Sequence, residues 1–133
     1  MKFNQTVVYA IAAVVQIAAD ASGKPLSNTA ICERTGMPPR FVLQILRHLV
    51  SGGVVTSVRG AFGGYRLAKP ASGITVLDIY KAVDSLVDIV DMRFDALAPA
   101  SRRVLTAALD GIVADARKRL ASVTVADLKT AKK

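Results

Sequence analysis

Four polar side chains near the middle of the chain have the types and the spacing to bind a polyanion. Arg40, Gln44 and Arg47 recur at helical spacing, and Ser51 continues the same stripe. Arginine can donate paired hydrogen bonds to guanine or to a phosphate, and glutamine can read adenine. The stripe therefore predicts a helix face that can contact nucleic acid, although an ordinary solvated helix surface would show the same spacing.

A short helix and a turn must precede the helix that carries this stripe. Ser27 can cap a helix that runs to Thr35, and Gly36 can end it. Pro39 suits the first turn of the next helix, which is predicted over residues 39–51. Two helices joined by a turn of this length form the helix-turn-helix pattern. The apolar face of the second helix is predicted to consist of Phe41, Val42, Ile45, Leu46 and Leu49.

A glycine-rich hairpin is predicted directly after these helices. Two short runs alternate apolar and polar side chains, and Gly60, Gly63 and Gly64 lie between them. Glycine can adopt a positive φ, or it can leave room for a phosphate backbone. A hairpin after a helix-turn-helix is a wing, whose Arg59 could enter a minor groove or hold phosphates. A plain hairpin with a flexible turn is the alternative.

The remaining elements are predicted to bury, brace and pair this unit. An alanine-rich apolar run predicts a buried first helix over residues 5–19. Thr75 can cap a fourth helix, and one last turn is predicted over residues 124–128. The predicted core face of the fourth helix consists of Leu77, Tyr80, Val83 and Val87.

A long helix is predicted from residue 99 to about residue 122. Its apolar stripe has coiled-coil-like spacing and exceeds what so small a domain can cover. We therefore expect the helix to pair two copies of the chain, with packing back on the first helix as the alternative. The expected dimer interface consists of Leu105, Leu109, Ile112, Val113, Ala116 and Leu120.

The composition narrows the class of partner. Eighteen Lys and Arg against ten Asp and Glu give a formal net charge of +8, and 52% hydrophobic residues are enough for a core. A basic excess favours nucleic acid, although ribosomal and membrane-surface proteins share it. No secretory signal is recognised, the longest apolar run is too short to span a bilayer, and one cysteine suits a reducing compartment. We expect a cytoplasmic protein.

Few residues offer other chemistry. With one histidine and one cysteine, no nucleophile, base and orienting group can be assembled, so an enzyme is not expected. The acidic residues between 78 and 95 have the spacing of a solvated surface, so no metal site is expected. Cys32 could act as a redox sensor near a DNA-binding helix, or it could be a small buried side chain.

At the wing, the sequence is similar to a known family. SVRGAFGGYRLAKP, followed by ITVLDIYKAVD, resembles the Rrf-two family of bacterial winged-helix transcription regulators, the group of IscR, NsrR and CymR. FVLQILRHLVSGGVV resembles the family's recognition helix, and LASVTVADL resembles its C-terminal ending. The resemblance implies a homodimer on a roughly palindromic operator in double-stranded DNA. It also implies a helix in the major groove, a wing in the minor groove and a long helix between subunits.

The resemblance also implies site residues and two departures. Many members bind an iron–sulfur cluster through three cysteines, but residues 85–105 contain none here, so no cofactor is expected. Members often carry an acidic residue before the recognition-helix glutamine; Leu43 stands there, so an operator sequence cannot be transferred. The expected DNA-binding residues are Ser27, Asn28, Thr29, Arg40, Gln44, Arg47, His48, Arg59, Gly60, Gly63, Gly64 and Tyr65.

The expected fold class is mainly α with a small β-hairpin. We expect a winged helix-turn-helix DNA-binding domain over residues 1–90, and a dimerisation helix with a C-terminal tail over residues 91–133. The expected function is that of a homodimeric, sequence-specific transcription regulator that acts as a repressor and has no membrane partner. The alternative is a protein-interaction module in which the winged helix docks a partner protein.

Overall fold

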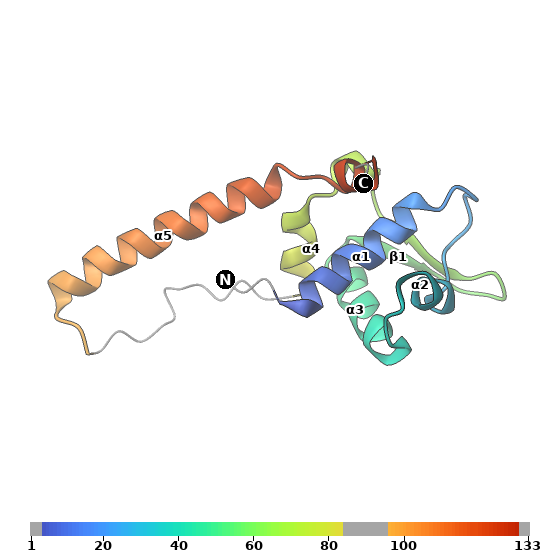
Figure 1. Cartoon of the computed structure of the whole chain (residues 1–133), viewed down its shortest axis with the longest axis horizontal. Helices are drawn as coiled ribbons and strands as arrows, with labels where there is room; N and C mark the ends of the chain where they lie inside the picture. The colour runs from blue at the N-terminus through green and yellow to red at the C-terminus, as the bar shows by residue number, and fades with distance from the viewer. Residues whose placement is uncertain (1–3, 84–95, 131–133) are drawn as a thin grey trace.

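The computed structural model of the protein describes residues 4–83 and 96–130. Figure 1 shows a body made of the shorter helices and the hairpin, from which one long helix, α5, extends. The predicted class, mainly α with a small β-hairpin, is confirmed. The elements are α1 (Gln5–Ala19), α2 (Asn28–Thr35), α3 (Pro39–Ser51), β1 (Val55–Val58), β2 (Gly64–Leu67), the 3-10 turn η1 (Ala71–Gly73), α4 (Val76–Val83), α5 (Pro99–Ala121) and α6 (Val125–Thr130).

Helix α1 lies at the centre of the body. It contacts α2, α3, α4, α6 and β2. Its buried side chains include Ala10 and Ala13, which are fully shielded from solvent. Their small size lets neighbouring helices approach the α1 backbone closely, and the larger Val7, Val14 and Ile17 fill the space between these helices. The predicted buried first helix is therefore confirmed.

Local capping sets the helix limits that position the site. The Ser27 Oγ accepts a hydrogen bond from the Ala30 N–H at 3.1 Å, which satisfies an unpaired donor at the start of α2. Gly36 ends α2 with φ +73°, a left-handed conformation that favours glycine. Pro39 occupies the first turn of α3, after an extended Pro38. These limits agree with the sequence prediction because each signal acts within one turn.

The predicted core face of α4 is partly wrong. Val76, Ile79 and Tyr80 are buried, whereas Leu77 and Val83 are only half-buried. Reciprocal hydrogen bonds between Thr75 and Asp78 begin the helix where the sequence predicts. The difference lies in the face that is covered, because Val76 and Ile79, which the prediction left out, are buried beside Tyr80. The predicted Val87 lies outside the described residues.

Helix α6 packs on the body. The Val76 N–H donates to the Val123 carbonyl at 2.9 Å, and the Val125 N–H donates to the Ile74 carbonyl at 2.8 Å. Val125 is fully buried against the same core as α1. The last turn expected after the long helix is therefore a docked helix. The division of the chain at residue 90 stays a prediction.

A second pair of capping hydrogen bonds begins α6. The Thr124 N–H donates to the Asp127 Oδ2 at 2.9 Å, and the Asp127 N–H donates to the Thr124 Oγ1 at 3.1 Å. This repeats the arrangement of Thr75 and Asp78, and the two threonines face each other in an isolated antiparallel bridge. The starts of α4 and α6 are thus held together.

Helix α5 leaves its apolar stripe open. None of its residues is buried, and Val104 and Ile112 are 74% and 63% exposed. Figure 1 shows α5 extending away from α1, so the alternative that it packs back on the first helix is wrong. Among the described residues, none of the helices combines the length and apolar character that crossing a bilayer requires.

Replacing Val125 with alanine tests the docking of α6. We expect V125A to lower the free energy of unfolding by about 2 kcal/mol, because a buried valine loses its contacts. V104A makes the same change at an exposed site of α5 and should stay within about 0.5 kcal/mol of the wild type. Urea unfolding followed by circular dichroism measures both. Equal effects of the two variants would contradict the docking of α6.

The α6 cap predicts a dependence of stability on pH. The Thr124 N–H and hydroxyl groups bind the Asp127 carboxylate and hold its pKa below the ordinary 3.8. The Asp127 carboxylate therefore stabilises the folded protein at pH values above its pKa in the unfolded chain. This contribution is lost as the pH falls through its pKa in the folded protein. The thermal midpoint of the wild type should therefore exceed that of D127N at pH 6, and the difference should shrink below about pH 4. D110N, which changes an exposed aspartate within α5, is the control. A difference of the same size at pH 3 as at pH 6 would contradict this cap.

Candidate nucleic-acid interface

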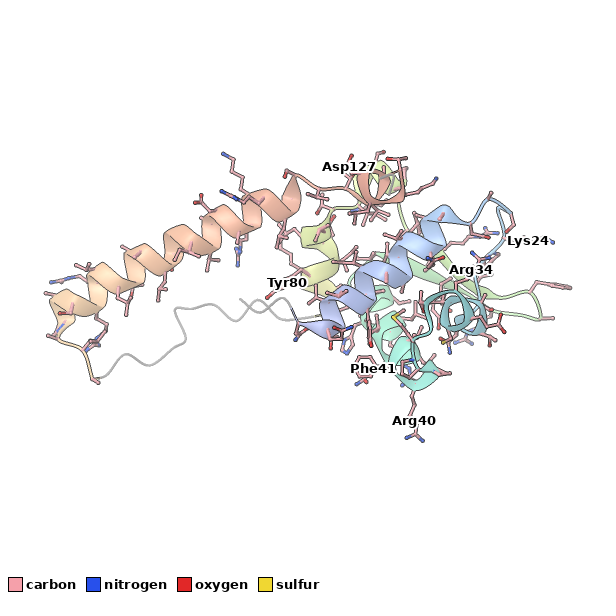
Figure 2. The ribbon with its side chains drawn as sticks, in the orientation of Figure 1. Lys24, Arg34, Arg40, Phe41, Tyr80 and Asp127 are labelled. Carbon is pink, nitrogen blue, oxygen red and sulfur yellow. The ribbon has the colours of Figure 1, made fainter. Side chains whose placement is uncertain are left out.

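Helix α3 separates an apolar face from a polar face. Val42, Ile45, Leu46 and Leu49 are buried, whereas Arg40, Gln44, Arg47, His48 and Ser51 are exposed. Figure 2 shows the Arg40 side chain pointing from the end of α3 away from the body. The polar stripe expected from the sequence is therefore a solvent-facing surface, available to a partner.

Phe41 differs from its prediction as a core residue. Its side chain is 39% exposed, and its ring meets the Tyr9 ring edge-on, with centroids 5.7 Å apart and an interplanar angle of 89°. Phe41 lies in the first turn of α3, and the Tyr9 ring of α1 covers one side of its ring. It therefore forms the rim of the core beside the polar stripe.

The start of α2 presents a second group of donors. Thr29 is exposed, and the Ser27 Oγ accepts from Ala30, which leaves the hydroxyl hydrogen for another acceptor. The Asn28 side chain is partly engaged, since the Cys32 Sγ donates to its Oδ1 at 3.7 Å. The first-turn N–H groups of a helix suit a phosphate, because they point outward and carry partial positive charge.

The tip of the wing is a closed turn. The Gly63 N–H donates to the Gly60 carbonyl at 3.0 Å, and Gly60 adopts φ +119°. A Cβ at Gly63 would lie 2.3 Å from the Val58 carbonyl oxygen. Both glycines are therefore required by the turn itself, without any approach of a phosphate.

The wing is joined to the start of α2. The Leu26 N–H donates to the Tyr65 carbonyl at 3.0 Å, and the Tyr65 N–H donates back at 2.9 Å. A Cβ at Gly64 would lie 2.5 Å from the Leu26 carbonyl oxygen, so glycine allows this close approach. The Arg66 Nη2 also donates to the Gly23 carbonyl at 3.3 Å. The wing and the first turn of α2 thus form one rigid surface.

The cations of this surface are available to an anion. Within residues 4–83 and 96–130, one ion pair is found, between the Arg34 Nη2 and the Asp20 Oδ1, which lie 3.2 Å apart. Arg40, Arg47 and Arg59 are exposed and make no ion pair within this part of the chain. Their charge is therefore not neutralised by the protein and can release counterions from a polyanion.

Reasoning from the sequence missed Phe62. Its side chain is 88% exposed at the tip of the wing, next in the chain to Gly63. A large apolar residue inside a glycine-bounded turn was the available signal, because such a turn has no neighbouring element to cover it.

Cys32 lies on α2 and is half-buried. Partial burial raises the pKa of its thiol above the ordinary 9.0, which disfavours the reactive thiolate. The redox-sensor role stays a prediction, and this environment weighs against it.

Comparison with known proteins identifies the family. The sequence model of Rrf2, described as an iron-dependent transcriptional regulator, matches residues 3–131. The chain belongs to the Rrf2 family. It is 32% identical over 130 residues to Rv1287 of Mycobacterium tuberculosis, assigned as an HTH-type transcriptional regulator, with 96% of this chain and 81% of that protein covered. It is 39% identical over 80 residues to IscR of Escherichia coli, with 60% of this chain and 49% of IscR covered.

Solved structures of family members share the fold. The global cysteine regulator CymR of B. subtilis superposes with a TM-score of 0.77 at 25% identity, and the match covers 100% of this chain and 99% of CymR. IscR of T. potens gives a TM-score of 0.75 at 28% identity, covering 96% and 85%. The fold is thus the winged helix-turn-helix of DNA-binding transcription regulators, a class that is not enzymatic.

The residues of this Rrf2 protein do not fit an iron–sulfur cluster. Such clusters are bound chiefly by several cysteine thiolates, whereas this chain has one cysteine and one histidine, neither of them within residues 84–95. Cys32 lies on α2 and His48 on the exposed face of α3. The part of the chain that the structure describes contains no group of three candidate metal ligands.

Proposed function

We propose that two copies of this chain bind a roughly palindromic operator and repress transcription by occupying promoter DNA in the cytoplasm. The observation that carries the proposal is the set of unpaired cations on one surface. Arg40 and Arg47 flank Gln44 on the exposed face of α3, and Arg59 stands on a wing that is fixed to α2. Side chains at these positions suit base edges in a major groove and phosphates or a minor groove beside it.

The open face of α5 supports the homodimer. Leu105, Leu109 and Val113 are half-buried and Ile112 is largely exposed, although α5 does contact α4. An uncovered apolar stripe of this length is favourable to bury against a second copy of itself. Two subunits would then present two α3 helices to successive half-sites of DNA.

Arginine substitutions test DNA binding. The probe is a duplex that the wild-type protein selects from a pool of random sequences, called here the selected duplex. We expect R59A to weaken binding and to lower the slope of log affinity against log salt by about one, because one phosphate contact is lost. R47A should reduce the binding free energy by about 1–3 kcal/mol if Arg47 reads a base.

R103A is the matched control, because it removes one exposed charge on α5, away from α3 and the wing. Its affinity and salt slope should stay near those of the wild type. Equal losses from R59A and R103A would refute the wing assignment.

A stoichiometric protein partner captured at physiological salt, with no DNA footprint, would favour the protein-interaction alternative. In vitro transcription from a promoter with the selected duplex should fall as protein is added; a rise would indicate an activator.

A charge in the α5 stripe tests the dimer. I112E should convert the protein to monomers, because an unpaired carboxylate would be buried between the two helices. Operator affinity should then fall roughly a hundredfold, since the two half-sites are no longer bound together. Light scattering coupled to gel filtration measures the mass. A114E adds the same charge to the opposite, exposed face of α5 and should remain dimeric. A monomeric wild type would refute the proposed assembly.

A further inference from the structure

Phe62 has an unusual position among the exposed apolar side chains. At 88% exposure it is the most open large hydrophobic residue in the described ranges 4–83 and 96–130. A single exposed apolar side chain is common on protein surfaces and needs no explanation by itself. The place of Phe62 on the wing, and the charges around it, carry the inference.

The turn orders the backbone that carries the Phe62 ring. Strands β1 and β2 end opposite each other at Val58 and Gly64, so five residues form the tip. Within the tip, the hydrogen bond from Gly63 to Gly60 makes Ala61 and Phe62 the two central residues of a β-turn. The backbone below the ring is therefore already ordered, and little backbone conformational entropy is lost when the ring binds a partner.

Basic side chains surround the ring. A shallow depression beside the tip is lined by Lys24, Arg59 and Arg66 together with Phe62, and no acidic residue lines it. Figure 1 shows the hairpin tip and the loop between α1 and α2 projecting from the same side of the body, and Figure 2 shows Lys24 on that loop. An apolar ring among uncompensated cations suits a polyanion with an apolar interior. Stacked bases between phosphate strands have that character, whereas an apolar protein surface would leave the cations unpaired.

We propose that Phe62 is an apolar wedge that enters the minor groove beside Arg59 and presses between two bases of the operator. The inference rests on the proposed DNA binding and adds a second means of recognition. Arg59 responds to the negative potential of a narrow groove, whereas Phe62 responds to how easily a base step opens. Pyrimidine–purine steps unstack most readily, so the wing should prefer such a step and bend the duplex there.

Three variants of the full-length protein test the wedge on the selected duplex. F62A removes the ring, F62L keeps an apolar wedge without an aromatic face, and A61S changes the neighbouring exposed residue as the control. We expect F62A to bind about tenfold more weakly, with the salt slope of the wild type, because no charge is lost. The affinity of F62L should lie between those of F62A and the wild type, and the affinity of A61S should match that of the wild type.

A fluorescent base reports the insertion itself. 2-Aminopurine, an adenine analogue that brightens when it is unstacked, is placed at successive positions of the selected duplex under the wing. The wild-type protein should raise the 2-aminopurine fluorescence at one base step, whereas F62A should not. Thermal unfolding of the variants should be unchanged, because the ring is exposed.

The wedge would be overturned if F62A bound the selected duplex with the affinity of the wild type. It would also be overturned if F62A bound more weakly but gave the same 2-aminopurine signal as the wild type. Failure of the proposed function is a different result, since the wild-type protein would then select no sequence at all.

Discussion

Two backbone hydrogen bonds between Leu26 and Tyr65 hold the candidate DNA-binding surface together. A two-stranded hairpin is marginally stable alone in water, so the wing needs a partner. Leu26 supplies it as an isolated bridge to β2, and Gly64 allows the backbones to approach. Because Ser27 follows Leu26 directly and caps α2, the same contact fixes the wing and the first turn of α2 relative to each other.

A second junction orients the long helix. Helix α5 ends at Ala121, and the chain then pairs with the residues that begin α4, through the Val76–Val123 and Val125–Ile74 hydrogen bonds. The end of α5 is thereby anchored on the body that also carries α3. In the proposed dimer, this anchor would set the distance between the two α3 helices and hence the spacing of the half-sites.

The face formed by α3 and the wing differs in chemistry from the face of α5. The face with α3 and the wing keeps its arginines free of ion pairs within the described residues, as binding to a polyanion requires. The face of α5 keeps an apolar stripe open, as pairing with a second copy requires. The single cysteine of this Rrf2 protein does not fit the several thiolates that bind an iron–sulfur cluster.

Features that act within one or two turns of the chain could be predicted from the sequence. Ser27, Gly36 and Pro39 place the ends of α2 and the start of α3, because caps and proline restrict only their neighbours. The helical period places Arg40 and Arg47 on the exposed face of α3, and the wing motif indicates the family.

Contacts between segments far apart in the chain could be seen only in the folded protein. The pairing of Leu26 with Tyr65, the docking of α6 on α1 and the edge-on contact of Phe41 with Tyr9 join residues that no local pattern connects. The exposure of Phe62 likewise depends on no other element covering the turn. Such outcomes follow from packing across the whole core, where burial depends on every neighbour at once rather than on the spacing of residues along the chain.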